Sequence, residues 1–547
     1  KLFENKGNGK FVDVSKKAGI HNRAYGLSAT TADFNDDGWP DLLVANDFVM
    51  PDFLYLNNRR GGFTEEAHRW FDHTANHSMG CDIADLNNDA RPDICIPDML
   101  GSTPRRRKEL INTMIPERTR LLEKQGYGRQ QMRNVLQLFN PTPIPSPRGQ
   151  GGLIPFHTSD RKLGQKGLEP SHTSDRKQTR DQAPLHRGDG GGVYAELGCL
   201  AGIEATEWSW APLIADFDND GWKDLFISAG VYRDLNDQDF FFYTADSLQK
   251  TGGITPGRFK DFEAFAGKMS SYPVHNFMFQ NTGSFPLREV SEAWGLDEKG
   301  FSNGAAYADL DNDGDLDLVI NKMNEPAAVY ENKAAQTNSN RWLQIKCKGT
   351  PANPAGTGAK VWVYAGGQLA FYQEMTPIRG FYSSVEPLFQ IVLGKNANVD
   401  RVEIEWPEGN MQVLENVPAN QRLILDIANA RPGRIPRPGA WPALFTDAGA
   451  VLPGFAHREN DFEDFNRERL LLHRFSRSGP CLAAGDVNGD GLDDLFAGGA
   501  AGQAGAIFIQ QTNGRLSPTP QPALDADARH EDTGAAFLDA DGDGDAD

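Results

Sequence analysis

The chain has 547 residues, 39% of them hydrophobic, and its formal net charge at pH 7 is −20. This size allows two or three domains with cores of their own. The acidity disfavours nucleic acid and anionic membranes as partners. No run of about 18 apolar residues, the length that spans a membrane as a helix, occurs in the sequence.

The main repeated feature is a nine-residue phrase with carboxylates or amides at positions 1, 3, 5 and 9. Position 6 is glycine except in the second copy, where Ala90 stands, and we expect that copy to be strained, weak or empty. We call the copies loops 1 to 6, and they run over residues 33–41, 85–93, 216–224, 309–317, 486–494 and 539–547.

Oxygen donors at alternate positions of a tight turn suit calcium, which takes six to eight oxygen ligands. Position 7 can add its backbone carbonyl. Up to six structural calcium ions are therefore predicted, and they would offset much of the net charge. The candidate ligands are Asp33, Asn35, Asp37, Trp39, Asp41, Asp85, Asn87, Asp89, Arg91, Asp93, Asp216, Asp218, Asp220, Trp222, Asp224, Asp309, Asp311, Asp313, Asp315, Asp317, Asp486, Asn488, Asp490, Leu492, Asp494, Asp539, Asp541, Asp543, Asp545 and Asp547.

These loops are not EF-hands, because an EF-hand needs a bidentate Glu at position 12. Position 12 is apolar in loops 1 to 5, as at Val44 and Ile227. Short apolar runs on both sides of loops 1 to 5 indicate buried strands. Each loop is then the turn between two strands.

The spacing of the loops indicates a β-propeller. Asp33 and Asp85 are 52 residues apart and Asp486 and Asp539 are 53 apart, close to the period of a four-stranded blade. A second hairpin phrase, such as Leu54-Tyr-Leu-Asn57 followed by a glycine turn, recurs between loops. Two hairpins per period would complete a blade.

The Asp loops, with flanks such as Gly304-Ala-Ala-Tyr-Ala-Asp-Leu310, resemble the FG-GAP/VCBS repeats of integrin α-like propellers. Residues 341–428, with Gly356-Thr-Gly-Ala-Lys-Val361 and Val402-Glu-Ile-Glu-Trp-Pro-Glu-Gly409, are similar to the ASPIC/UnbV domain. The combination resembles the cartilage-acidic-protein-like family, whose bacterial members are large surface or secreted proteins. The resemblance implies an all-β fold whose first propeller has seven blades, here incomplete.

The predicted domains follow from these features. Residues 1–335 are the last blades of a first propeller, 341–428 the small UnbV-like β domain, 429–443 a proline-rich linker, and 444–547 the beginning of a second propeller. The chain starts within a hairpin and stops at the ninth residue of loop 6. We therefore expect a fragment of a longer protein.

Two insertions interrupt the first propeller. The stretch from Thr103 to Leu138 is basic and helix-like, and its run Arg105-Arg-Arg-Lys108 is interpreted as a solvated helix face. Residues 141–190 are expected to be disordered or a sequence artefact, and Arg187-Gly-Asp189 within them to be a chance match to an adhesion motif. Residues 233–273, rich in Phe, are expected to form a cap. Any ligand pocket is expected at this cap and the first insertion.

Catalytic and redox motifs give no positive signal. The five cysteines show no metal spacing, and a disulfide between Cys81 and Cys95 is left open. His457 beside Glu459 is interpreted as part of a strand motif. No catalytic residue and no cofactor besides calcium is predicted.

The leading hypothesis is a calcium-stabilised, non-enzymatic propeller at the cell surface, outer membrane or outside the cell, which binds a protein or glycan. Extracellular calcium levels match the affinities of such modules. The alternative is a secreted hydrolase or polysaccharide-active enzyme with its site on the propeller face. A third interpretation is RNA binding by the UnbV-like domain.

Overall fold

The structure is a computed structural model. It describes residues 1–139 and 194–435, apart from 8, 22, 111–115, 241, 245–266 and 268, and residues 455–539, apart from 463, 468–475 and 477–480. The chain divides into a first unit, residues 1–151 and 191–438, and a second unit, residues 152–190 and 439–547. The predicted insertion 141–190, most of the linker and cap, and residues 540–547 of loop 6 lie outside the described residues.

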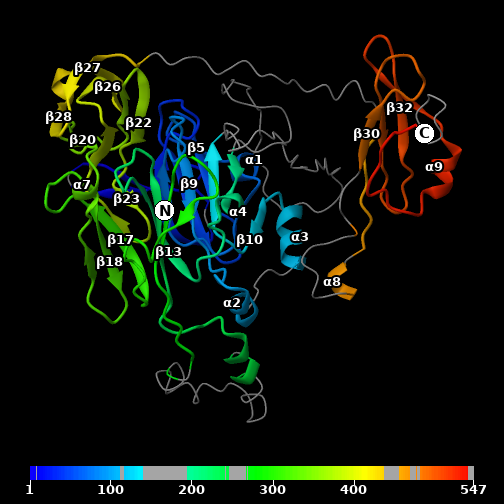
Figure 1. Ribbon diagram of the computed structural model, residues 1–547, viewed down its shortest axis with the longest axis horizontal. Helices are drawn as coiled ribbons and strands as arrows, with labels where there is room; N and C mark the ends of the chain where they lie inside the picture. Colours follow the sequence, from blue (N-terminus) through cyan, green and yellow to red (C-terminus); the bar gives the residue numbers. More distant parts are fainter. Residues whose placement is uncertain are drawn as a thin grey trace. The chain divides into compact units, whose positions relative to one another are not determined.

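The first unit contains a series of antiparallel sheets, each built around one Asp loop (Figure 1). The first sheet is β3 (Tyr25–Ala32), β4 (Asp41–Asp47), β5 (Phe53–Asn57) and β6 (Phe63–Glu65). The second is β8 (Asp82–Ala84), β9 (Asp93–Ile96), β11 (Val135–Phe139) and β12 (Tyr194–Glu196). The third is β13 (Ser209–Ala215), β14 (Asp224–Ala229), β15 (Phe277–Gln280) and β16 (Arg288–Glu289). The fourth is β17 (Ser302–Ala308), β18 (Asp317–Lys322) and β19 (Ala328–Tyr330).

The strands follow the predicted repeat closely. In each sheet the Asp loop joins the first strand to the second, and the apolar run after the loop becomes the second strand, as at Leu225 to Ile227 in β14. The first strands β3, β13 and β17 share a register shift near their starts, at Gly26, Ser209 and Ser302. The same local irregularity at the same point indicates one repeated unit.

Packing between successive sheets makes the fold all-β and propeller-like. One core cluster joins Cys95 and Leu136 of the second sheet to Leu225 and Phe279 of the third. Another joins Leu213 and other side chains of the third sheet to residues of the fourth. Sheets that pack face to face, one after another along the chain, are arranged like the blades of a β-propeller.

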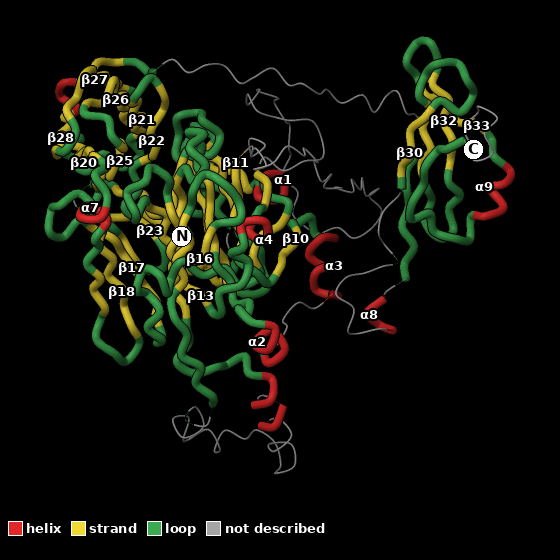
Figure 2. The backbone as a smooth tube through the Cα atoms, viewed as in Figure 1, coloured by secondary structure: helices red, strands yellow, loops and turns green. Residues whose placement is uncertain are grey.

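Short elements complete this part of the chain (Figure 2). The strands are β1 (Phe3–Asn5) with β2 (Phe11–Asp13), and β7 (His73–Ala75) parallel to β10 (Arg129–Gln131). The helices are α1 (Ala67–Trp70), α2 (Pro104–Glu109), α3 (Pro116–Lys124), α4 (Gly198–Ala201) and α7 (Ala334–Thr337). The helix-like prediction for 103–138 is therefore correct for α2 and α3, but wrong at its end, where β10 and β11 lie.

The small domain, residues 341–432, has two sheets around one core. One sheet is β25 (Leu388–Gly394), β20 (Arg341–Lys348) and β28 (Gln421–Asp426). The other is β22 (Gln368–Glu374), β21 (Lys360–Ala365), β26 (Asn398–Trp406), β27 (Asn410–Pro418) and β29 (Arg431–Pro432). A 3₁₀ turn, η2 (Ile427–Asn429), follows β28.

A hairpin of the small domain, β23 (Ile378–Arg379) and β24 (Ser383–Ser384), lies against the first strands of the blades. The backbone N–H of Cys81 donates to the carbonyl of Gly380 at 3.1 Å, and Phe381 packs on Trp210 with ring centroids 4.9 Å apart. Arg379 is fully buried and donates to Asp82 at 2.8 Å. The small domain is thus anchored in the blades by a buried ion pair.

The second unit carries one further blade-like sheet. Its elements are α8 (Asp464–Arg467), β30 (Leu482–Gly485), β31 (Asp494–Ala497), β32 (Ala506–Gln510), β33 (Leu516–Thr519) and α9 (Pro522–Asp527). Loop 5 joins β30 to β31, as the corresponding loops do in the first unit. His457 contacts Glu459 at 3.1 Å and the Gly498 carbonyl at 3.2 Å, an arrangement that holds the chain against this sheet.

Candidate metal centres

Loops 1 to 5 share one hydrogen-bond pattern, which Asp216 to Asp224 of loop 3 illustrate. The position 1 carboxylate of Asp216 accepts from the N–H groups of Asp220 at 3.1 Å and Gly221 at 2.8 Å. The position 9 carboxylate of Asp224 accepts from Phe217 at 3.0 Å and from Asn281 of the neighbouring hairpin at 2.9 Å. Equivalent bonds recur in loops 1, 2, 4 and 5. The turn fixes both carboxylates, so that their free lone pairs are available to a cation.

Backbone conformation explains two positions of the motif. Position 6 has a positive φ in loops 1 to 5, including 100° at Gly221 and 65° at Ala90, so loop 2 holds an alanine where glycine is favoured. Position 4 also has a positive φ, as at Asn219. That requirement escaped the sequence interpretation, although every position 4 residue of these loops is Asp, Asn or Gly, the types that tolerate this conformation.

Two loops bring three carboxylates together. One carboxylate oxygen from each of Asp216, Asp218 and Asp224 lies within 4.8 Å of the others, and the same holds for Asp309, Asp311 and Asp313. Both clusters could hold a metal ion. In loop 4 the buried Oδ1 of Asp315 has no hydrogen-bond partner, so an oxygen atom of this loop is left without a donor.

The electrostatics of the loops favour a cation. Burial, with the neighbouring carboxylates, raises the pKa of Asp216 to about 8 and that of Asp41 to about 7. Burial likewise raises the pKa of Asp220 to about 6 and that of Asp224 well above its usual range. Carboxylates crowded in a buried turn hold protons unless a cation neutralises them. Loop 5 differs, because half-buried Asp486 accepts backbone N–H groups that lower its pKa.

The small domain reaches the position 1 carboxylates of two loops. Lys360 donates to Asp33 Oδ2 of loop 1 at 2.6 Å, and both side chains are buried. Gln344 donates to Asp309 Oδ2 of loop 4 at 2.5 Å. The loops are therefore part of the contact between the blades and the small domain. Long sequence separation hid these partners from sequence analysis.

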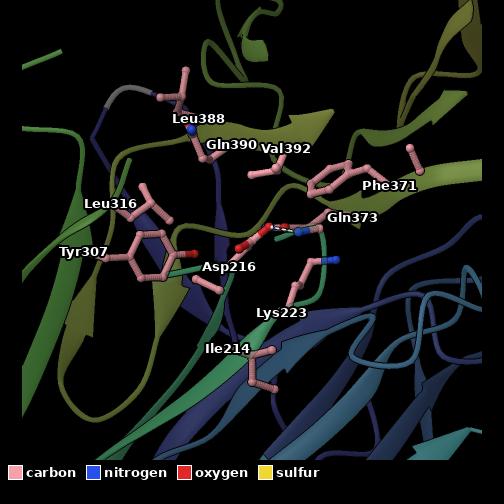
Figure 3. A pocket seen from close by; sticks show the side chains of 13 residues that line it. Ile214, Asp216, Lys223, Tyr307, Leu316, Phe371, Gln373, Leu388, Gln390 and Val392 are labelled. Carbon is pink, nitrogen blue, oxygen red and sulfur yellow. Dashed lines mark hydrogen bonds between the residues drawn. The ribbon is translucent and has the colours of Figure 1, made fainter. Parts of the chain in front are cut away.

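Loop 3 borders a cleft between the blades and the small domain (Figure 3). The Asp216 carboxylate lies between the side chains of Tyr307 and Gln373. Lys223, at position 8, donates to the Asp85 carbonyl of loop 2 at 2.9 Å and lies 4.6 Å from the Phe371 ring centroid. A buried ammonium thus lies between loops 2 and 3.

The predicted ligands are placed unevenly. The structure groups three carboxylates in loop 3 and three in loop 4, and it gives loops 1, 2 and 5 the same turn. Of loop 6, Asp539 is described, while Asp541, Asp543, Asp545 and Asp547 lie outside the described residues. Among the described residues all five cysteines are free, so the disulfide left open between Cys81 and Cys95 does not form.

The fold and the loops together define a propeller-like protein with a small appended β domain. Family models match accordingly: FG-GAP-like repeat at residues 1–44, 33–96 and 486–547, and ASPIC and UnbV at residues 349–432. The chain thus carries FG-GAP-like repeats and an ASPIC and UnbV domain, as the sequence predicted.

Curated relatives of the chain are forms of cartilage acidic protein 1. The mouse (Mus musculus) protein is 22% identical over 266 residues, 44% of this chain and 41% of the relative. The Xenopus tropicalis protein is 24% identical over 45% of this chain and 41% of the relative, and the human (Homo sapiens) protein 29% identical over 26% and 22%. The homology is weak, and the chain spans about two fifths of the mouse and frog proteins that it matches. Neither the FG-GAP-like repeat nor cartilage acidic protein 1 defines a family of enzymes.

One solved structure covers most of the chain. It is titled as the structural basis of specific recognition of non-reducing terminal N-acetylglucosamine by an Agrocybe aegerita lectin, and it is 12% identical over 93% of this chain and 82% of that chain. Its TM-score of 0.24 is too low to support an argument about fold or ligand. Among the described residues, no helix is long and apolar enough to cross a membrane.

Proposed function

We propose that this chain is part of an extracellular, calcium-binding β-propeller scaffold that binds a protein or glycan and has no catalytic activity. The observation that carries the proposal is the convergence of three carboxylates in each of loops 3 and 4, from a turn repeated in every described blade. The proposed location is outside the cell, at the cell surface or in association with the outer membrane.

Calcium suits the donor set better than a softer metal does. The donors are carboxylate, amide and carbonyl oxygens, with no histidine or thiol among them. In loop 3 the ion would be held by Asp216, Asp218, Asp220 and Asp224, with the Trp222 carbonyl. Bound there, calcium neutralises the carboxylates whose proximity otherwise opposes folding.

Calcium binding is tested on the full chain by titration calorimetry and by thermal unfolding with calcium or a chelator. We expect calcium to raise the melting temperature, with more than one ion bound per chain. Asp224→Asn and Asp317→Asn should each remove part of the calcium uptake. The matched control is Asp297→Asn, which removes one exposed carboxylate outside the loops. A melting temperature that neither calcium nor chelator changes would refute the proposal.

A further inference from the structure

Loops 1 and 4 are paired with different side chains of the small domain. Lys360 of β21 donates to Asp33 Oδ2 at position 1 of loop 1, and Gln344 of β20 donates to Asp309 Oδ2 at position 1 of loop 4. The two donors occupy equivalent places, and both are buried. They differ in charge, because the lysine is a cation and the glutamine is neutral. A loop that already contains a buried cation has less need of calcium.

The Lys360 ammonium is surrounded by carboxylates, as a bound metal ion would be. Its Nζ atom lies 2.6 Å from Asp33 Oδ2 and 3.3 Å from Asp36 Oδ1. Glu374 of β22 lies opposite Lys360 in the sheet, accepts from the Asp33 N–H at 3.0 Å, and acts on Lys360 through its charge. Carboxylates of the loop and of the small domain therefore share one positive charge in a buried place.

A second cation reaches position 5 of loop 1. Arg59 Nε donates to Asp37 Oδ2 at 3.0 Å, although the Arg59 side chain is half exposed. At position 5 of loop 4 the donor is an amide, since Gln336 Nε2 lies 2.6 Å from Asp313 Oδ2. Loop 1 is therefore paired with cations at two positions where loop 4 is paired with neutral amides.

The carboxylates of the other loops follow the same division. Among the described residues, no Lys or Arg forms an ion pair with a carboxylate of loop 3 or loop 4, and these are the two loops whose carboxylates converge in threes. Lys223, between loops 2 and 3, donates to backbone carbonyls instead. Loop 4 has a buried oxygen without a partner, Asp315 Oδ1, whereas loop 1, all of which is described, has none. Loop 1 also has Asn35 at position 3, where loops 3 and 4 have Asp.

We propose that Lys360 takes the place of calcium in loop 1. A divalent ion on the Asp33 carboxylate would meet the ammonium at close range, and two cations repel each other strongly in a buried site. The contact between the blades and the small domain at loop 1 then persists when calcium is scarce, while loop 4, whose partner is Gln344, depends on calcium. The inference rests on the proposed calcium-binding function and states which loops the ion fills.

The experiment exchanges the two donors in the full chain. Lys360→Gln gives loop 1 the partner of loop 4, and Gln344→Lys gives loop 4 the partner of loop 1. The matched control is Lys346→Gln, at a half-exposed lysine of the same domain. Bound calcium is counted by equilibrium dialysis at millimolar free calcium, the range of extracellular modules. Melting temperatures verify that each variant folds, and Lys360→Met is a second variant that removes the same ammonium.

A second measurement locates any added ion. Terbium replaces calcium at sites built of oxygen ligands, and its emission is excited by a nearby indole. Trp39 stands at position 7 of loop 1, so an ion in this loop lies close to its indole. The emission that Lys360→Gln gains over the wild-type chain should therefore disappear when both chains also carry Trp39→Phe.

We expect Lys360→Gln and Lys360→Met each to bind one calcium ion more than the wild-type chain, Gln344→Lys to bind one fewer, and Lys346→Gln to bind the same number. The inference is overturned if both Lys360 variants keep the wild-type count, if folded Gln344→Lys keeps it, or if Trp39→Phe leaves the gained emission in place. The proposed function survives each of these results. A wild-type chain that binds no calcium refutes the proposed function itself, together with the inference that rests on it.

Discussion

The ion pair between Lys360 and Asp33 provides a sharp test of how the small domain and loop 1 depend on each other. Lys360 Nζ lies 2.6 Å from Asp33 Oδ2 and 3.3 Å from Asp36 Oδ1, and the Lys360 and Asp33 side chains are 7% and 2% exposed. Lys360→Met keeps the length of the side chain but removes the ammonium. Without calcium the substitution leaves a buried carboxylate without its cation, which costs about 3–5 kcal/mol.

Calcium should reduce this cost. An ion in loop 1 would supply positive charge to the same carboxylate, so the loss should fall to about 1 kcal/mol, the net contribution of one hydrogen bond. The assay is urea unfolding of the full chain, in parallel with a chelator and with millimolar calcium.

The control for this substitution is Lys346→Met in the same domain. Lys346 pairs with Glu386 at 3.1 Å, but the two side chains are 45% and 36% exposed, so its loss should cost less than about 1 kcal/mol under both conditions. If the two variants lose the same free energy of unfolding in chelator, the reasoning about burial is refuted. A loss for Lys360→Met that calcium does not reduce would show that no ion approaches Asp33.

Three further predictions concern the loops and the anchor. Ala90→Gly should stabilise the chain by about 0.5–1 kcal/mol, because Ala90 has a φ of 65°; a lower melting temperature would contradict this. In chelator, stability should fall as pH rises from about 4 to 8. The folded pKa of Asp216 is raised to about 8, so over this range the folded state holds a proton that the unfolded state has lost. Melting temperatures that stay constant over this range would contradict the prediction. Arg379→Met should lower the free energy of unfolding in urea by about 3–5 kcal/mol, and adding Asp82→Leu should recover most of this loss; a double variant no more stable than Arg379→Met would contradict this.

The loops and strands could be predicted because their signals are local. The alternation of Asp with Gly at position 6 determines the turn, and the apolar residues after position 9, such as Leu42 to Val44, form the next strand. Both patterns lie within about a dozen residues of sequence. The same spacing of carboxylates and amides occurs in six loops, so the repeated structural unit could be identified with little ambiguity.

The contacts that position the candidate sites could not be predicted in this way. Arg106 is separated from Glu207 by 101 residues and from Asp234 by 128, while Lys360 is 327 residues from Asp33. A charge run on a short helix is usually solvated, and only the tertiary partners show that Arg106 is buried.

The small domain also makes the calcium loops unequal. Lys360 and Gln344 occupy the same place in loops 1 and 4, the Oδ2 atom of the position 1 Asp, yet one is a cation and the other is neutral. A buried ammonium beside a metal site repels a divalent ion, and low dielectric strengthens that repulsion. Loop 4 should therefore bind calcium more tightly than loop 1, although their acidic residues are similar. The affinity of each loop is then set by the domain packed against it as well as by its own nine residues.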